Sequence, residues 1–563
     1  MSFILKIYFM LLFGITQSFA LSQQDYSGYS TERIQILKKG SLLFHQKEPF
    51  SFFKKTLQLS WTPEWDIDLI DEPKCFPDNF LSNLININNK EQLNLLQSLW
   101  RNCEPKLRKT QYNSVYDSLK MLSIDYSLLN HPFAHEVIFN LHNQQKVRGL
   151  FLINNSTQRD LVILRPGIYS SFQTMVAERF LVQTLFDEGQ FNVLILPSTT
   201  GRQFINDNEN YRFGALEEGL QTYLISKILN DPKEPFHQLI SKINAVGISM
   251  GGHGLIVTNI IQSFFENQTQ NIEKSIYFCP LINYDETKKN LNSSLLSSWA
   301  NQYWNWMRLE PLRNKNNIRF SEFFKGDNWL QNITYPNDTL YFENLLNFIS
   351  SVLHKDIQKT KPNNKSDLLT KLYDFAKNKK YNSSMTLFET LKNISQPYLQ
   401  SLVFYTDVDP IVPPQLNILN SGDFFEKSIV LKLNKGVHCS VPVNYNHSFF
   451  SKIINGYLNP NLNSILNSNK KPITNSSLLR LKNLLNSNYK ITNIYFLTLS
   501  EIKVELQKQN WLGSYDIQNL KLNKSDLDFE WSPDDIYKSQ LKKIIRTRLN
   551  SLNNKTNLSG FVD

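Results

Sequence analysis

The chain has 563 residues, of which 41% are hydrophobic, 13% aromatic and 20% charged. This composition can bury a large interior, which excludes a mainly disordered protein, and the length exceeds that of one ordinary domain. The formal net charge is +10. Because the lysines are spread among acidic and asparagine residues instead of forming one basic stripe, the sequence predicts no nucleic-acid partner.

The first twenty residues have the features of an export signal. Lys6 precedes an apolar run over residues 7–15, and the small residues Ser18 and Ala20 follow, as signal peptidase requires. The alternative is an uncleaved anchor helix, but the run is shorter than the roughly 20 residues that span a bilayer. We therefore expect a signal peptide over residues 1–20, a secreted or periplasmic location, and no stable membrane insertion.

Four cysteines are present, and an exported protein permits disulfides. Cys75 and Cys103 are the first pair to consider, although sequence alone does not determine connectivity. Cys279 and Cys439 lie in core segments, where a cysteine usually acts as a small buried hydrophobic residue. No H-E-x-x-H motif and no paired C-x-x-C spacing occurs, so the sequence predicts no metal site and no cofactor.

Residues 21–134 form a predicted N-terminal extension without a repeat or motif. After it, two β-rich runs at 135–142 and 146–153 predict a hairpin. Short apolar strands then alternate with helical patterns, which is typical of an α/β fold with helices on both faces of a mostly parallel sheet. The first part of this core is predicted over residues 135–281, with further strands at 161–164, 191–196, 243–248 and 274–278 and helices at 171–186, 216–229 and 252–265.

The alternation stops at the end of this first part. Residues 282–395 are rich in Asn, Lys and aromatic residues with helical periodicity, and we interpret them as an insertion. Residues 459–563 are predicted to be an Asn/Ser-rich linker and a C-terminal extension. Between these segments lies the second part of the core, predicted over residues 396–458 with strands at 402–406 and 428–433 and a helix at 449–458.

Residues 247–251 read Gly-Ile-Ser-Met-Gly and lie between a predicted strand and a predicted helix. A nucleophilic serine on such a sharp turn has strained backbone angles, and only very small residues fit two positions to either side. The alternative is a phosphate-binding turn, but that motif requires glycines ahead of the helix instead of a central serine, and no G-K-[ST] is present. We therefore predict that Ser249 is a nucleophile.

A serine hydroxyl needs a base that removes its proton and usually a carboxylate that orients the base. Asp407 and Asp409 follow the strand at 402–406, and His438 follows the strand at 428–433. Catalytic groups of open α/β sheets gather at this carboxyl edge. We predict His438 as the base, and Asp407 and Asp409 are the two candidates for the acid.

The segments Ser-Met-Gly-Gly, D-x-x-V-P and G-x-H, each after a strand, resemble those of the α/β-hydrolase superfamily over residues 135–281 and 396–458. The resemblance implies an α/β-hydrolase fold with a mostly parallel eight-stranded sheet. It implies a nucleophile after strand five, an acid after strand seven and a histidine after strand eight. The D-x-x-V-P segment places the acid at Asp409, with Asp407 as the alternative. It also implies that the insertion at 282–395, between strands six and seven, forms a helical cap over the nucleophile.

Acyl transfer also needs hydrogen-bond donors for the oxyanion that forms on the attacked carbonyl. The backbone amide of Met250, directly after the nucleophile, is the first candidate, and the loop over residues 165–169 should supply the second. Ile168 is our preferred donor in this loop, and Tyr169 is the alternative.

The sequence as a whole predicts a serine hydrolase that cleaves a small-molecule carboxylic ester or acyl substrate through an acyl-enzyme. An acyltransferase or a peptidase would use the same residues. The alternative from another class is a secreted binding protein that has a hydrolase fold without turnover, because fold alone does not establish activity. The sequence does not determine the oligomeric state.

Overall fold

The computed structural model describes the core of the chain and parts of the segments beside it. The predicted signal peptide, Cys75, most of the insertion and everything beyond residue 459 lie outside the described residues. The described ranges are 33–37, 90–108, 134–141, 145–153, 158–172, 178–209, 215–265, 271–283, 309–323, 401–407, 409–418, 428–435 and 447–459, with Leu128, Met175, Thr287, Lys289, Asn290, Gln302, Tyr303, Trp306, His438, Cys439 and Tyr445.

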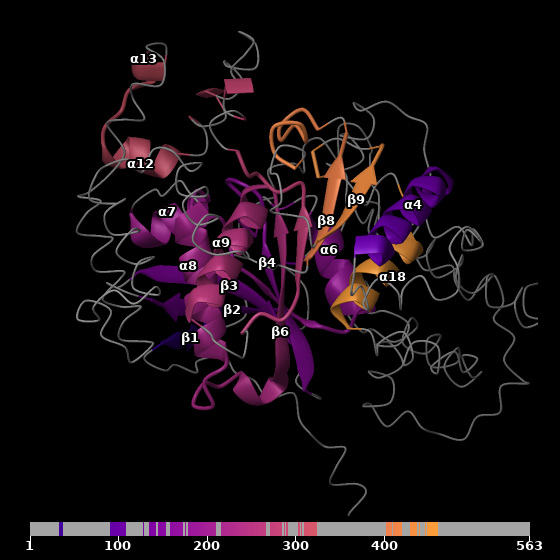
Figure 1. The fold of residues 1–563 in the computed structure, drawn as a ribbon. Helices are drawn as coiled ribbons and strands as arrows, with labels where there is room; N and C mark the ends of the chain where they lie inside the picture. Colours follow the sequence, from indigo (N-terminus) through magenta and orange to yellow (C-terminus); the bar gives the residue numbers. More distant parts are fainter. Residues whose placement is uncertain are drawn as a thin grey trace, which may run out of the picture.

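Among these residues, nine strands form one sheet in the order β1-β2-β3-β5-β4-β6-β7-β8-β9 (Figure 1). The pairs β1-β2, β2-β3 and β3-β5 are antiparallel, and every pair from β5 across to β9 is parallel. The strands are β1 Ile34–Ile36, β2 Ala134–Asn140, β3 Lys146–Leu152, β4 Arg159–Arg165, β5 Asn192–Ile195, β6 Ile240–Ile248, β7 Ser275–Phe278, β8 Ser401–Thr406 and β9 Ile429–Leu433.

The predicted number of eight strands is therefore wrong by one. The additional strand β1 lies in the segment that the sequence assigns to the N-terminal extension, and it pairs with β2 at the edge of the sheet. Its residues Ile34 and Ile36 are buried, whereas Gln35 between them is exposed. Three residues are too few for this alternation to be recognised as a strand in a sequence.

Helices cover both faces of the sheet, as the alternation of strands and helices predicts (Figure 1). Along β4, Leu161 and Ile163 pack in an apolar cluster with α8 and α9, whereas Val162 and Leu164 pack in a second cluster with α4, α6, η5 and α18. Each buried aliphatic side chain contributes roughly 1.5–3 kcal/mol. The helices are α4 Lys90–Leu107, α6 Glu178–Val182, the π-helix η5 Gln183–Glu188, α7 Arg202–Asn208, α8 Ala215–Leu229, the short 3-10 helix η6 His237–Leu239, α9 Met250–Phe265, α12 Glu310–Lys315, α13 Phe320–Phe323 and α18 His447–Leu458.

The helix predicted over residues 171–186 begins later, at Glu178, and continues as a π-helix to Glu188. Two hydrogen bonds hold the preceding residues in a loop. The amide of Ser170 donates to the Gly167 carbonyl at 3.2 Å, and the amide of Phe172 donates to the Gln203 side chain at 3.3 Å. The first is a local turn and the second a tertiary contact, and both compete with the local helical pattern that predicted the earlier start.

The described part of the insertion contacts the core beside the loop that follows β4. It runs in the chain between β7 and β8 and contains α12 and α13. Trp306, Leu309 and Leu312 form a buried cluster with Tyr169 and Ile205, two residues of the core. The inserted segment is therefore anchored on the core through apolar contacts.

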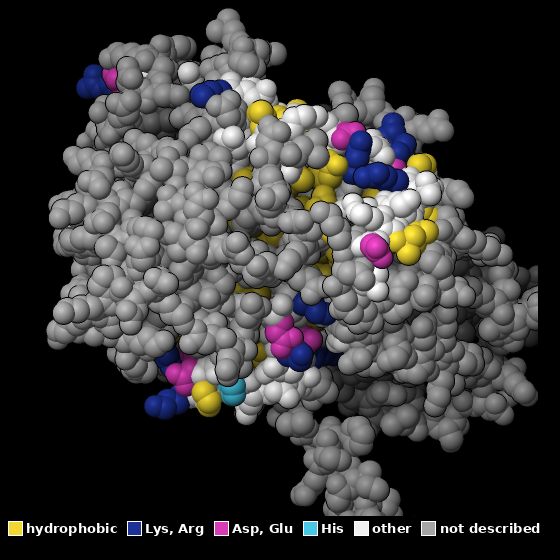
Figure 2. Space-filling model, viewed as in Figure 1, with side chains coloured by type: hydrophobic (Ala, Val, Ile, Leu, Met, Phe, Trp, Pro, Cys, Tyr) yellow, Lys and Arg dark blue, Asp and Glu magenta, His cyan; other side chains and the backbone are white. Residues whose placement is uncertain are grey.

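Basic and acidic side chains lie next to each other on the described surface in the view of Figure 2. The ion pairs of the described residues include Lys242 with Glu273 at 2.9 Å, in which both side chains are exposed. Exposed pairs of this kind contribute little to stability. Within the described part of the chain, the structure contains no helix of sufficient length and apolar character to cross a bilayer.

We predict that Gly251→Ala destabilises the fold by about 3 kcal/mol or more, because its new methyl group would overlap the carbonyl oxygens of Arg165 and Pro166. Gly252→Ala, one residue further along α9, is the matched control. Its methyl group would lie 3.1 Å from the Pro280 Cβ and 3.2 Å from the Pro280 Cα, a much smaller overlap that a shift of a few tenths of an ångström relieves. Denaturant unfolding of both variants measures the difference, and equal stability of the two would contradict this account of the turn.

Candidate functional site

Ser249 lies at the sharp turn between β6 and α9, where the sequence places the nucleophile. Its φ is +54°, a left-handed conformation that is strained for a residue with a side chain. Two backbone hydrogen bonds hold this conformation: the Ser249 amide donates to the Phe278 carbonyl at 2.9 Å, and its carbonyl accepts from the Leu281 amide at 3.1 Å. The turn is thus fixed to the end of the neighbouring strand β7.

Four strained residues gather around the carboxyl ends of the parallel strands. Tyr169, Ser249, Cys279 and Cys439 have φ values of 62°, 54°, 44° and 50°, and they follow β4, β6, β7 and β9 respectively. Left-handed backbone at residues other than glycine costs on the order of 1–3 kcal/mol each and concentrates at functional sites. Four of the seven described non-glycine residues with positive φ thus lie at the edge of the sheet that the sequence indicates.

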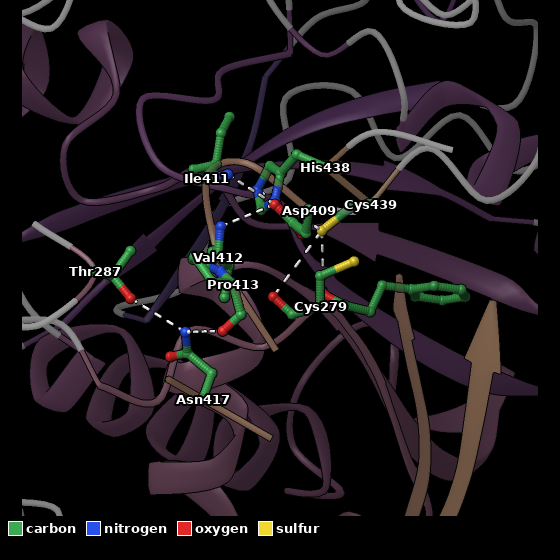
Figure 3. A network of polar contacts seen from close by, with 10 residues as sticks. Cys279, Thr287, Asp409, Ile411, Val412, Pro413, Asn417, His438 and Cys439 are labelled. Atoms are coloured by element: carbon green, nitrogen blue, oxygen red, sulfur yellow. Dashed lines mark hydrogen bonds and ion pairs between the residues drawn. The ribbon is translucent and has the colours of Figure 1, made fainter. Parts of the chain in front are cut away.

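Asp409 and His438 are joined by hydrogen bonds at this edge (Figure 3). The imidazole Nδ1 lies 2.8 Å from one carboxylate oxygen and 3.0 Å from the other. A carboxylate only accepts, so Nδ1 carries the hydrogen. The backbone amides of Ile411 and Val412 donate to the same carboxylate at 2.9 and 2.8 Å and hold it in place. Asp407, the alternative acid, instead pairs with Lys432 at 2.5 Å.

The structure does not join Ser249 to His438 by a hydrogen bond between the described side chains. It does bring the loops that carry the predicted site residues into contact. Met250, Leu281 and Val412 form one buried apolar cluster, and Ile168 packs against it. The turn at Ser249, the end of β7, the loop after Asp409 and the loop after β4 therefore meet in one place.

The loop after β4 lies directly against the nucleophile. A Cβ atom on Gly167 would be 3.6 Å from the Cβ of Ser249, in ordinary van der Waals contact. The Gly167 amide donates to the Glu178 carboxylate at 3.3 Å, and the Tyr169 amide donates to the Thr200 hydroxyl at 2.8 Å. Glu178 and Thr200 thus fix the loop on both sides of Ile168.

The amides of Ile168 and Met250 are the two candidate oxyanion donors. Among the described contacts of this loop, the amides on either side of Ile168 have acceptors and that of Ile168 has none. Met250 is the first residue of α9, and the first amides of a helix have no acceptor within it. The alternative donor, Tyr169, already donates its amide hydrogen to Thr200. The hydrogen bonding of the loop favours Ile168 over Tyr169.

Two free cysteines, Cys279 and Cys439, are buried beside Asp409. The Cys439 thiol donates to the Phe278 carbonyl at 3.4 Å. Burial raises the pKa of both thiols, so they are protonated at neutral pH and are poor nucleophiles. Cys103 is disulfide-bonded, and its predicted partner lies outside the described residues.

A clamp from the N-terminal extension holds the loop after β9, which carries His438. Glu104 in α4 accepts hydrogen bonds from the Asn434 amide at 3.1 Å, from the Asn434 side chain at 2.8 Å, and from Arg108 and Tyr445. The Trp100 indole donates to a carbonyl of β9 at 2.6 Å. The sequence analysis missed this clamp, because no local pattern connects residues more than 300 positions apart.

The order of the strands decides the fold. Without the edge strand β1, the sheet has eight strands, and Ser249 follows the fifth, Asp409 the seventh and His438 the eighth along the chain. These are the positions that the resemblance to the α/β-hydrolases implies. The chain has the α/β-hydrolase fold. The insertion at 282–395 follows the sixth strand of this core in the chain.

Comparisons by sequence give no match to a protein-family description or to a curated protein. Solved structures similar to the hydrolase fold of this chain include an esterase from Pyrococcus furiosus (13% identity, 58% of this chain and 92% of that chain, TM-score 0.31). Est1E from Butyrivibrio proteoclasticus is similar at 10% identity (57% and 96%, TM-score 0.30). Acetyl xylan esterase 1 from Thermoanaerobacterium is similar at 11% identity (64% and 93%, TM-score 0.28). Similarities at this level carry no argument about activity.

We predict that Glu104→Gln lowers the free energy of unfolding by about 2 kcal/mol at pH 7, because it removes a buried, charge-assisted hydrogen-bond acceptor. Burial alone raises the pKa of Glu104, but the hydrogen bonds from Arg108, Tyr445 and Asn434 outweigh it and hold the pKa below its ordinary value of 4.5. Because the pKa of Glu104 is lower in the folded state, its carboxylate stabilises the folded protein at pH values above the ordinary pKa. This stabilisation is lost as the pH falls through the folded-state pKa.

Denaturant unfolding between pH 7 and pH 3 measures this effect. The difference between the natural protein and Glu104→Gln should shrink as the pH falls below about 4.5. Glu91→Gln, an exposed glutamate in the same helix, is the control and should change stability little at any pH. A difference that stays constant over this range would show that the Glu104 carboxylate is not the stabilising group.

Proposed function

We propose that this protein is a serine hydrolase that cleaves carboxylic esters of small molecules through an acyl-enzyme. The observation that carries the proposal is the hydrogen-bonded pair of Asp409 and His438, held at the same edge of the sheet as the strained turn of Ser249. A carboxylate that holds Nδ1 of an imidazole leaves Nε2 with a free lone pair, and this is the form that a general base needs. Export to a secreted or periplasmic location is part of the proposal.

In the proposed reaction, Ser249 Oγ attacks the ester carbonyl carbon while His438 Nε2 takes the hydroxyl proton. The imidazolium that forms is stabilised by Asp409, which keeps its negative charge. His438 then gives the proton to the leaving alcohol, and a water molecule activated by the same base releases the acid. Hydrogen bonds of catalytic groups in ligand-free enzymes are often long and close only when substrate is bound, so substrate binding is the step at which Ser249 and His438 meet.

The negative charge on the carbonyl oxygen is proposed to be held by the amides of Met250 and Ile168. Both donors are backbone groups, and the apolar cluster that joins them also includes Leu281 and Val412. Fixed donors need no reorganisation when the charge forms, and removing one donor of this kind costs about 3 kcal/mol in the transition state. Because Glu178 and Thr200 hold the loop on both sides, the Ile168 amide is fixed before substrate arrives.

The insertion is proposed to form a cap over this site. Its described residues Trp306, Leu309 and Leu312 pack against Tyr169, next to the Ile168 donor. Trp306 is buried, and the Arg313 guanidinium stacks on its ring at 3.8 Å. We assign these residues to the interface between cap and core, so the substrate contacts would come from other parts of the insertion.

A fluorophosphonate probe tests the nucleophile. We expect covalent labelling of the purified protein and loss of labelling in Ser249→Ala, because the probe phosphonylates only an activated serine. Circular dichroism confirms that the variant is folded. A folded natural protein that is not labelled would favour a binding protein without turnover, and labelling that persists in Ser249→Ala would move the nucleophile to another residue.

We predict that Asp409→Asn lowers kcat/KM for ester hydrolysis about a thousandfold or more, because the amide no longer stabilises the imidazolium and can favour the wrong tautomer. Asp407→Asn is the matched control in the same loop and should stay within about threefold, because Asp407 pairs with Lys432. The assay uses the best ester from a panel that also contains peptides and alcohol acceptors. The reverse ranking of the two variants would assign the acid to Asp407.

A further inference from the structure

Three side chains that can bind a metal lie close together next to the imidazole of His438. One ligand atom each from Cys279, Asp409 and Cys439 lies within 4.8 Å of the other two, and all three residues are buried. In Figure 3 the two sulfur atoms lie near the Asp409 carboxylate and the His438 ring. The residues follow β7, β8 and β9, so the cluster lies across three neighbouring parallel strands.

The spacing of the cluster fits a small divalent cation with soft ligands. Zinc binds sulfur at about 2.3 Å and oxygen or nitrogen at about 2.0–2.2 Å, so the ligand atoms of a tetrahedral site lie about 3.3–3.8 Å apart. The separations within the cluster reach this range after side-chain shifts of about 1 Å or less. His438 Nδ1 lies 3.7 Å from the Cys439 sulfur, but it carries the hydrogen that it donates to Asp409, so the remaining coordination position is left to water. Two thiolates and a carboxylate are a ligand set typical of zinc and cadmium.

We propose that Cys279, Cys439 and Asp409 bind one thiophilic divalent cation of the Zn²⁺ class. On binding, each thiol loses its proton to solvent and its sulfur forms a bond to the cation, so two protons leave for each cation bound. The carboxylate supplies an oxygen, and no oxidation or reduction takes place. Access is from the side of His438, whose side chain is 19% exposed.

The cation site shares Asp409 with the proposed catalytic pair. The imidazole Nδ1 lies 3.0 and 2.8 Å from the two Asp409 oxygens, so a cation bound to this carboxylate would compete with the imidazole for it. An imidazole without this partner is no longer held as a general base. The cation is therefore an inhibitor of hydrolysis, and this consequence rests on the proposed function.

Cadmium is the probe, because its bonds to thiolate produce charge-transfer absorption in the ultraviolet. We expect two free thiols per chain when the natural protein is unfolded and treated with a thiol reagent, and one equivalent of Cd²⁺ bound by the folded protein.

Cys279→Ala and Cys439→Ala should each weaken Cd²⁺ binding at least about a hundredfold. Asp407→Asn, which leaves the cluster intact, is the control and should bind as the natural protein does. Cys279→Ser and Cys439→Ser provide a second pair of variants if either alanine variant fails to fold.

Several outcomes overturn the site. No free thiol in the natural protein would mean that the two sulfurs form a disulfide. Absence of the charge-transfer band, or an unchanged band in both cysteine variants, would remove the cluster as the ligand set. These readouts do not depend on activity, so a protein that binds Cd²⁺ but is not labelled by fluorophosphonate contradicts only the proposed function. Labelling at an unchanged rate with Zn²⁺ bound overturns the inhibition.

Discussion

The structure of the site depends on the close approach of the turn at Ser249 to the loop after β4. A Cβ on Gly251 has no room beside the carbonyls of Arg165 and Pro166, so the helix α9 can begin at this place only when the residue has no side chain. This approach places Gly167 against Ser249, and Ile168 packs against the apolar cluster that contains Met250. The strained φ of Ser249 follows from the same geometry.

A buried network of polar side chains adjoins this loop. The Arg165 guanidinium donates to Thr222 at 2.7 Å and to the Pro197 carbonyl at 3.0 Å, and the Glu218 carboxylate accepts from Ser198 at 2.7 Å. Burial lowers the pKa of Arg165 to about 10, so it stays charged at neutral pH. A charge removed from water costs several kcal/mol, and neutral hydrogen-bond acceptors hold the Arg165 guanidinium. Such a network contributes rigidity at the carboxyl end of β4 more than it contributes stability.

The sequence predicted the parts of the site that local patterns encode. The order of the strands and the sharp turn at the G-x-S-x-G element are observed in the structure, and the choice of Asp409 over Asp407 as the acid stays a prediction that the Asp409–His438 hydrogen bond supports. Contacts between distant segments leave no local pattern in the sequence, so three features were not predicted. They are the edge strand β1, the clamp from Glu104 to Asn434, and the proximity of Cys279 to Cys439. The cysteines illustrate the reason, because each alone is typical of a buried hydrophobic position, and only the sheet brings the pair beside Asp409.

The central claim is that Ser249, His438 and Asp409 act together on a carbonyl group. A crystal structure of the protein after reaction with a phosphonate ester tests it most directly. The account predicts phosphorus bonded to Ser249 Oγ, His438 Nε2 within hydrogen-bonding distance of that oxygen, and the phosphonyl oxygen facing the amides of Met250 and Ile168. Phosphorus on another residue, or an imidazole that remains out of reach of the bound serine, would contradict it.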